Sequence, residues 1–256
     1  MSFQLRREEV LDGAQLSAML AENPAKAAQA ILIAAKQGIV DGQALLGQIL
    51  LDGQGIERDP VLAKRWFQIA ANSGHLMARN MLGRCWEHGW GGPVDCTLAS
   101  LEYRQAAEAG LDWALYNYAN LLATGRGVAP DQGAAFKLYR VAAQAGHAKS
   151  MNLVGRYLEE GVYCPGDKQA AWVWYERSAR GGDFRGQFSH ASVLAEAGRI
   201  DEALTWFERA LAGGNLNFLR VSLAALLEAS DLRVRAMSEA WQARIHTLQS
   251  SPVQNR

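Results

Sequence analysis

Glycine recurs at a fixed interval of 36 residues through most of this chain. The glycines that open successive units are Gly38, Gly74, Gly110, Gly146 and Gly182. A second column follows 15 residues later at Gly53, Gly89, Gly125 and Gly161. A third stands two residues further on at Gly55, Gly91 and Gly127, with Tyr163 in the fourth unit. A period of this length predicts an array of stacked units, because each period encodes one supersecondary structure.

Four further columns keep the same register, counted from the opening glycine of each unit. Aspartate holds offset 21 at Asp59, Asp95, Asp131 and Asp167. Alanine holds offset 25 at Ala63, Ala99, Ala135 and Ala171, and offset 33 at Ala71, Ala107, Ala143 and Ala179. An aromatic residue holds offset 29 at Phe67, Tyr103, Tyr139 and Tyr175. Chance does not keep so many columns in register through four units.

Each unit is predicted to be a helix, a tight turn and a second helix. The first helix, helix A, covers offsets 2 to 14 and ends at the second glycine, which takes the left-handed conformation of a C′ residue without penalty. The aspartate is the N-cap of helix B, over offsets 22 to 35, because its carboxylate accepts bonds from free backbone N–H groups. Alanines and the aromatic share one face of helix B. One hairpin cannot bury that face alone, so the units should stack into an all-α solenoid.

The third unit carries a motif of known spacing. Its matching positions are Ala114, Tyr118-Ala119, Leu122, Gly125, Gly127-Val128, Asp131, Ala135, Leu138-Tyr139, Ala142-Ala143 and Gly146. This motif resembles the Sel-one-like repeat family, a relative of the tetratricopeptide repeat. The resemblance implies a right-handed α/α superhelix of about five to six repeats. It also implies a non-enzymatic protein–protein interaction scaffold or adaptor, in a bacterial regulatory or signalling pathway.

The repeat register sets the expected domain boundaries. Residues 1–37 are a degenerate repeat that caps the N-terminal end, with a helix A over 6–22 and a helix B that starts at Asn23-Pro24. The repeats themselves are expected at 38–73, 74–109, 110–145, 146–181 and 182–213. The fifth is shorter, with its deletion before helix B. Residues 214–249 form two C-terminal capping helices, over 215–229 and 231–248, and 250–256 are a flexible tail.

Charge and composition exclude several classes of function. The chain has 26 basic and 26 acidic side chains and a formal net charge of zero, which argues against a nucleic-acid partner. Its longest apolar run, residues 27–35, is too short to span a membrane. Cys85, Cys96 and Cys164 are sparse and lack a CxxC pair, which fits free thiols in a reducing compartment. The expected location is the cytoplasm.

No motif in the sequence predicts catalysis or a cofactor. It contains no P-loop, no HExxH and no GxSxG, so neither an enzyme nor a cofactor or metal site is expected. Cys85 and His88 have the spacing of half a zinc site, but a buried inert thiol is the favoured interpretation of Cys85. His75 and His147 stand at helix starts, where capping or surface roles are expected. An enzyme with an unrecognised, scattered site remains an alternative.

The resemblance to tetratricopeptide repeats implies a binding groove on the concave face, lined by offsets 3, 6, 10 and 13 of helix A. The expected partner-binding residues are Asn80, Arg84, Trp113, Tyr116, Asn120, Lys149, Asn152, Arg156, Arg185 and Phe188. Asparagine can bond to the backbone of an extended peptide, arginine can bind a carboxylate, and aromatic residues are common interface anchors. The expected partner is therefore a protein or peptide with an acidic segment.

Two alternatives to this groove stay open. Arg84 and Glu87, and likewise Arg156 and Glu159 or Glu160, have the spacing of helical ion pairs and could neutralise each other. Alternatively, the chain is a self-assembling module that forms a homo-oligomer through its last helix. In that case Trp241 and Ile245 would pack against a second copy.

Overall fold

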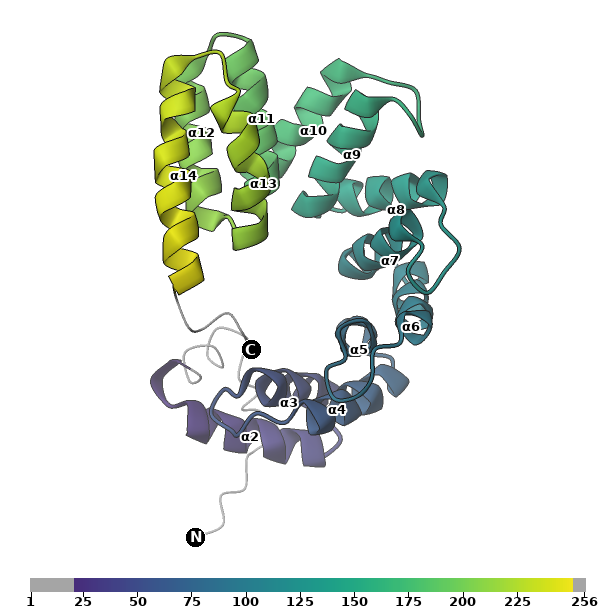
Figure 1. Cartoon of the computed structure of the whole chain (residues 1–256). Helices are drawn as coiled ribbons and strands as arrows, with labels where there is room; N and C mark the ends of the chain where they lie inside the picture. Colours follow the sequence, from purple (N-terminus) through teal and green to yellow (C-terminus); the bar gives the residue numbers. More distant parts are fainter. Residues whose placement is uncertain (1–20, 251–256) are drawn as a thin grey trace. The chain divides into compact units, whose positions relative to one another are not determined.

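The computed structural model describes residues 21–250, and every regular element in that range is an α-helix. The helices, labelled as in Figure 1, are α2 (Pro24–Lys36), α3 (Val40–Asp52), α4 (Pro60–Asn72), α5 (Leu76–His88), α6 (Cys96–Glu108), α7 (Asp112–Thr124), α8 (Gln132–Gln144), α9 (Ala148–Glu160), α10 (Lys168–Arg180), α11 (Phe184–Glu196), α12 (Ile200–Gly213), α13 (Leu216–Leu227) and α14 (Leu232–Ser250). Consecutive helices pack on one another from α2 to α6 and from α8 to α12, as helix-turn-helix repeats do, which confirms the predicted all-α solenoid. The helix expected over 6–22 and the tail after Ser250 lie almost wholly outside the described residues.

The chain forms two compact units. Unit 1 comprises Met1–Ala114 and Thr124–Pro130, and unit 2 comprises Leu115–Ala123 and Asp131–Arg256. The core of unit 1 is built from α2 to α5 and includes Leu46, Phe67 and Leu82. Unit 2 has one core around Tyr139, on α7 to α9, and a second among α11 to α14. Each unit therefore buries its own apolar helix faces.

Helix boundaries agree with the repeat register. Helix A of the second repeat was expected over 76–88 and is α5, Leu76–His88. Each aspartate at offset 21 caps its helix B, since its Oδ1 accepts a backbone N–H from the first turn. These bonds join Asp59 to Leu62 at 2.9 Å, Asp95 to Leu98 at 2.9 Å, Asp131 to Ala134 at 2.8 Å and Asp167 to Ala170 at 2.9 Å. Asn23 caps α2 in the same way, so the degenerate first unit keeps its helix B.

Gly89 shows why glycine ends each helix A. Its φ is 72°, in the left-handed region, and its N–H donates to the carbonyl of Cys85 to close the last turn of α5. A side chain at this backbone angle would clash with its own peptide, so only glycine fits without strain.

The aromatic residue of helix B packs directly on a glycine inside helix A. Tyr103 is fully buried, and a Cβ built on Gly83 would lie 2.6 Å from its ring. The same relation joins Gly47 to Phe67 and Gly155 to Tyr175. Glycine normally destabilises a helix interior, so its presence here reflects the ring that occupies the space of its side chain. In the third repeat Ala119 takes this position opposite Tyr139.

The third glycine column joins successive repeats. A Cβ on Gly91 would lie 2.3 Å from the carbonyl oxygen of Pro60, the first residue of helix B one repeat earlier. Gly55 meets Pro24 and Gly127 meets Cys96 in the same way. The turn of each repeat therefore rests on the backbone at the start of the preceding helix B. The fourth repeat has the exposed Tyr163 in this column, so it departs from the pattern.

The last four helices, α11 to α14, run side by side and close a separate core (Figure 1). Trp241 of α14 is fully buried there, and its indole N–H donates to the Ser222 hydroxyl at 2.9 Å. Ile245 also packs against this core. The expectation that Trp241 packs against a second copy is therefore wrong, because this residue is buried in the core of its own chain, while Ile245 is only partly covered by that core.

The contact between helix A and helix B predicts the effect of one added methyl group. We expect Gly83→Ala to lower the free energy of unfolding by about 1–3 kcal/mol, because the new Cβ overlaps the ring of Tyr103. The ring cannot easily move, since its hydroxyl donates to Glu87 at 2.7 Å. Urea unfolding followed by circular dichroism measures the change.

Gly133→Ala is the matched control for this substitution. Gly133 lies in the first turn of α8, where an added Cβ would meet only the Asp131 carboxylate, at 3.5 Å. The same change should raise stability there by about 0.5–1 kcal/mol, because alanine is the better helix former. Equal unfolding midpoints for the two variants would contradict the packing argument.

Candidate partner-binding surface

The predicted groove residues are divided between the two units. In unit 1, Asn80 is only 3% exposed, so its amide is not a surface group that a peptide backbone could reach. This corrects the role predicted for Asn80. Arg84 is half-buried, with its guanidinium carbon 4.8 Å from the centre of the Trp90 ring. Trp113 is 40% exposed and keeps the surface position that an anchor residue needs.

Glu87 belongs to a bonded cluster within unit 1. One carboxylate oxygen accepts from Arg126 at 2.7 Å, and the other accepts from the buried Tyr103 hydroxyl at 2.7 Å. Glu87 therefore pairs with Arg126, whereas Arg84 lies against Trp90. The same bond recurs two repeats later, where the Tyr175 hydroxyl donates to Glu159 at 2.7 Å. These glutamates at offset 13 hold helix A to helix B of their own repeat.

In unit 2, the polar groups of α7 and α9 are largely occupied by the fold. Asn152 is 3% exposed, and its side-chain oxygen accepts from the Ser189 hydroxyl of α11 at 3.0 Å. Asn120 is half-buried and accepts from the Tyr139 hydroxyl at 2.7 Å. Tyr116 is half-buried beside Tyr139, with the two ring centres 6.2 Å apart. The peptide-gripping role predicted for Asn152 is therefore wrong as well, because that residue joins two helices.

Basic groups of α9 and α11 remain accessible. Arg156 pairs with Glu160 at 3.2 Å, and both side chains are about half exposed, which confirms the predicted helical ion pair. Arg185 is half-buried over the ring of Phe184, at 4.5 Å. Phe188 packs edge-on against Phe207 at 5.1 Å, with part of its surface open to solvent. Exposed ion pairs are worth at most about 1 kcal/mol, so Glu160 holds Arg156 only weakly.

Asp183 places a buried carboxylate at the start of α11. It is 6% exposed and caps the helix by accepting the Gly186 N–H at 3.0 Å. Burial raises the pKa of Asp183 above its usual value. The Gly186 bond and the positive charges of Arg185 and Lys149 oppose this rise in pKa without cancelling it. The positive charges of Arg185 and Lys149 therefore lie near enough to Asp183 to favour its ionised form.

The cysteine and histidine side chains singled out by the sequence have structural positions. Cys85 is fully buried, as predicted, and burial raises the pKa of its thiol to about 11. His75 and His147 cap α5 and α9 by accepting backbone N–H groups at Nδ1, which confirms the capping interpretation. Within residues 21–250, no three His, Cys, Asp or Glu side chains are grouped closely enough to hold a metal ion.

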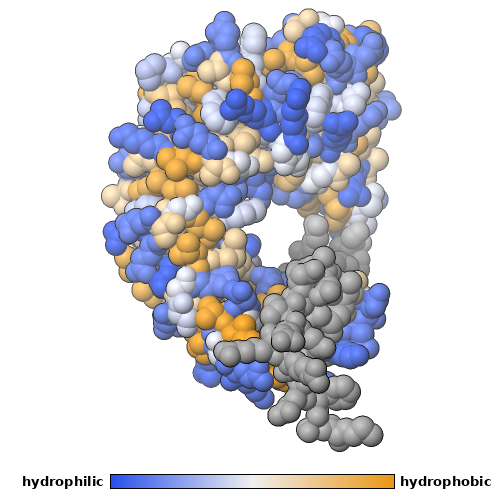
Figure 2. Space-filling model, turned by 180° about the vertical axis from the view of Figure 1, so that it is seen from behind, coloured by the Kyte–Doolittle hydropathy of each residue, from blue (hydrophilic) through white to orange (hydrophobic). Residues whose placement is uncertain are grey.

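In the described part of the chain, no helix has the length and apolar character needed to cross a membrane. On the face that Figure 2 shows, apolar side chains form small patches separated by hydrophilic ones. Trp172 and Val173 of α10 are among the exposed apolar residues, at 41% and 49%. Single exposed apolar residues are ordinary on protein surfaces, so Trp172 and Val173 do not by themselves indicate a binding site. The polar and charged side chains are the more informative guide to a binding surface.

Two features of the site were not foreseen from the sequence. The bonds from Tyr103 to Glu87 and from Tyr175 to Glu159 join residues 16 apart, and the recurrence of Glu at offset 13 with Tyr at offset 29 was the available signal. A pocket at the ends of α11 and α13 was also missed, because its residues come from the repeat that departs from the motif and from the C-terminal helices.

Stacked helix-turn-helix units with these glycine, alanine and aromatic contacts define an α-solenoid of short repeats. The Sel1 repeat model matches residues 40–75, 76–111, 114–147, 148–183 and 200–215, which is more than half of the chain. The chain belongs to the Sel1 repeat family, as its motif predicted. No curated protein matches the sequence.

Solved structures show the same fold. A Sel1 repeat protein from Oxalobacter formigenes is 23% identical with a TM-score of 0.74, over 91% of this chain and 98% of the other. A protective antigen of uropathogenic Escherichia coli strains, with an SLR fold, is 23% identical with a TM-score of 0.67, over 91% of this chain and 52% of the other. An immunity protein from Pseudomonas aeruginosa is 14% identical with a TM-score of 0.54, over 83% of each chain.

The buried Asp183 carboxyl predicts a dependence of stability on pH. Its folded pKa is raised, so the folded state holds the proton more tightly, and this contribution to stability is lost as pH rises through the folded pKa. An asparagine at this position would keep the helix cap without a charge. The Asp183→Asn variant should therefore gain stability relative to the parent chain as pH increases from about 4 to about 7. Thermal unfolding across this range tests it, and a parallel pH dependence of both proteins would contradict it.

Proposed function

We propose that this protein is a non-enzymatic adaptor that binds a partner protein through the helix A faces of its repeats. Sel1 repeat proteins generally serve as protein-interaction scaffolds. Stacked repeats suit this role because each contributes one helix face to an extended surface. The three cysteines are free, which suits action in the reducing cytoplasm.

The observation that carries the proposal is the group of cations on neighbouring helices of unit 2. Lys149 and Arg156 lie on α9, and Arg185 lies at the start of α11, two helices that pack together. Arginine binds carboxylates through two parallel bonds, and the exposed pair of Arg156 with Glu160 is weak enough to be exchanged. The partner segment is accordingly acidic, as the motif-based groove implied.

Aromatic side chains supply the apolar part of the proposed surface. Phe188 lies on the same helix as Arg185, and Tyr116 occupies the helix A face of α7. In unit 1, Arg84 with Trp90, and Trp113, offer the same combination of a cation and an aromatic ring. Asn80 and Asn152 are left out of this surface because they are buried.

Charge reversal tests the proposal. We expect Arg156→Glu combined with Arg185→Gln to reduce capture of the cognate partner by at least about tenfold, because two attractive contacts are lost and one becomes repulsive. Glutamine is used at position 185 because a new negative charge there would face the buried Asp183. Affinity capture from the source cells, quantified by isotope-labelled mass spectrometry, measures the loss.

Arg104→Glu is the matched control. Arg104 occupies the same position in α6 that Arg156 occupies in α9, and it forms the same type of ion pair, with Glu108. It lies on helix B, outside the proposed surface, so its reversal should leave capture unchanged. The proposal would be overturned if the parent chain, the double variant and the Arg104→Glu control all recovered the same proteins at equal levels.

A further inference from the structure

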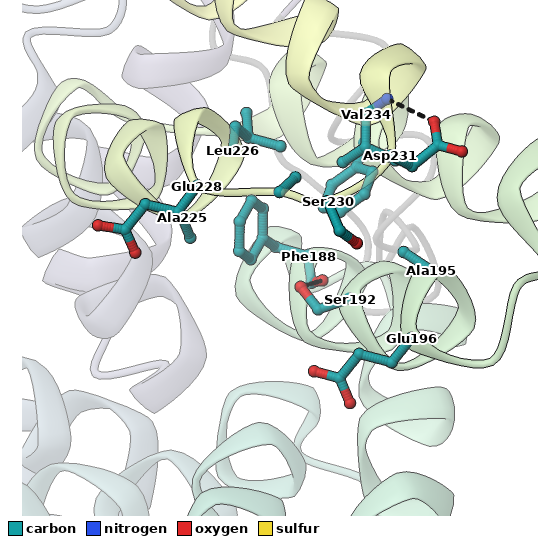
Figure 3. A pocket seen from close by; sticks show the side chains of 12 residues that line it. Phe188, Ser192, Ala195, Glu196, Ala225, Leu226, Glu228, Ser230, Asp231 and Val234 are labelled. Atoms are coloured by element: carbon teal, nitrogen blue, oxygen red, sulfur yellow. Dashed lines mark hydrogen bonds between the residues drawn. The ribbon is translucent and has the colours of Figure 1, made fainter.

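A pocket of about 340 Å³ lies in unit 2, where the C-terminal ends of α11 and α13 meet the start of α14. Its apolar lining includes Phe188, Phe207 and Leu226. Figure 3 shows Glu196, Glu228 and Asp231 placed around it on different sides. These three carboxylates are its charged lining residues, so the pocket has an apolar interior and an acidic rim.

The three carboxylates differ in how far the fold already uses them. Asp231 caps α14, accepting from the Arg233 N–H at 2.8 Å, and also lies 3.7 Å from the Arg233 guanidinium. Glu196 and Glu228 are exposed, and within residues 21–250 neither forms an ion pair. Two acidic groups at the rim are therefore available to a cation.

Helix electrostatics make these positions unusual. Glu196 is the last residue of α11, and Glu228 is the C-cap of α13, where the helix dipole already concentrates negative charge. Arg185 has the opposite mismatch, since it lies in the positive first turn of α11. Each of these charges opposes the dipole at its own helix end. A cation bound beside Glu196 and Glu228, and an anion bound beside Arg185, would relieve these mismatches.

The pocket's size and lining define the group that it fits. At about 340 Å³ it is at the small end of ligand sites, suited to one long side chain rather than a folded element. A basic side chain would place its methylene stem on Phe188 and Ala225 and its charge at the rim. Arginine fits better than lysine, because its planar guanidinium can stack on a ring and bond to a carboxylate.

We infer that this pocket receives an arginine side chain of the partner protein. The inference rests on the proposed function and deepens it. Arg185 and Glu196 are at opposite ends of α11, about 16 Å apart at the helical rise per residue. The partner segment thus carries an acidic group at one end and an arginine about 16 Å away, which fixes its direction along α11.

The test uses the full chain and a small probe, N-acetyl-arginine amide, with the uncharged N-acetyl-citrulline amide as its match in shape. Methyl NMR spectra report the pocket through Ala195, Ala225, Leu226 and Val234. The arginine probe should shift these signals saturably with a Kd of about 1–10 mM, and citrulline should bind at least about tenfold more weakly. Raised salt should weaken the arginine probe, because the rim contacts are ionic.

Variants of the rim separate charge recognition from apolar contact. The double variant Glu196→Gln with Glu228→Gln should weaken the arginine probe at least about fivefold. Glu208→Gln, an exposed change on α12 outside this pocket, should leave it unchanged. Equal binding of arginine and citrulline probes, or unchanged binding after the double substitution, would overturn the inference.

The outcome is distinguishable from failure of the proposed function. Arg156→Glu with Arg185→Gln leaves the pocket intact, so it should keep arginine-probe binding while partner capture is lost. If the arginine probe does not bind the parent chain, the pocket inference is overturned, whether or not the partner is captured. Partner capture that is unchanged by the double rim substitution would also overturn it.

Discussion

The contact between an aromatic ring on helix B and a glycine on helix A sets the geometry of the repeats. The ring of Tyr103 occupies the volume that a side chain at position 83 would need, and the same holds for Phe67 and Tyr175. Helices that meet through glycine approach closely and bury the alanines on either side. The Tyr103 and Tyr175 hydroxyls also donate to Glu87 and Glu159. In each of these repeats one tyrosine side chain therefore sets the distance between helix A and helix B and also bonds the two helices together.

The periodic part of the fold could be predicted from the sequence because its signals are local. A glycine at a helix end, an aspartate at a helix start and a 36-residue spacing each act through neighbouring backbone atoms. The bounds of α4 and α5 and the caps at Asp59 and Asp95 followed from these rules. Sequence spacing also predicted that Arg156 would find a carboxylate within its own helix.

The binding surface was harder to predict, because burial depends on how one repeat meets the next. Offset 6 was assigned to the groove by likeness to tetratricopeptide repeats, yet Asn152 faces Ser189 on the neighbouring α11 and is enclosed by it. Trp241 shows the same limit, since an apolar stripe does not reveal whether its own chain or another covers it. The acidic pocket arises where the period breaks, so no column of the repeat pointed to it.

The contact of Gly91 with the first residue of the preceding helix B has a consequence for how such a chain can change length. Because the turn of one repeat rests on the backbone of another, the two contacting positions must keep their separation of 31 residues, which is the same for Gly55 and Pro24, Gly91 and Pro60, and Gly127 and Cys96. A gain or loss of 36 residues among the repeats that carry this glycine keeps the separation, because the register of the repeats is unchanged. Most other changes of length would bring a residue with a side chain against the start of the preceding helix B. The backbone contact itself therefore favours growth by whole periods, and the fourth repeat, with Tyr163 in the glycine column, marks where the contact ends.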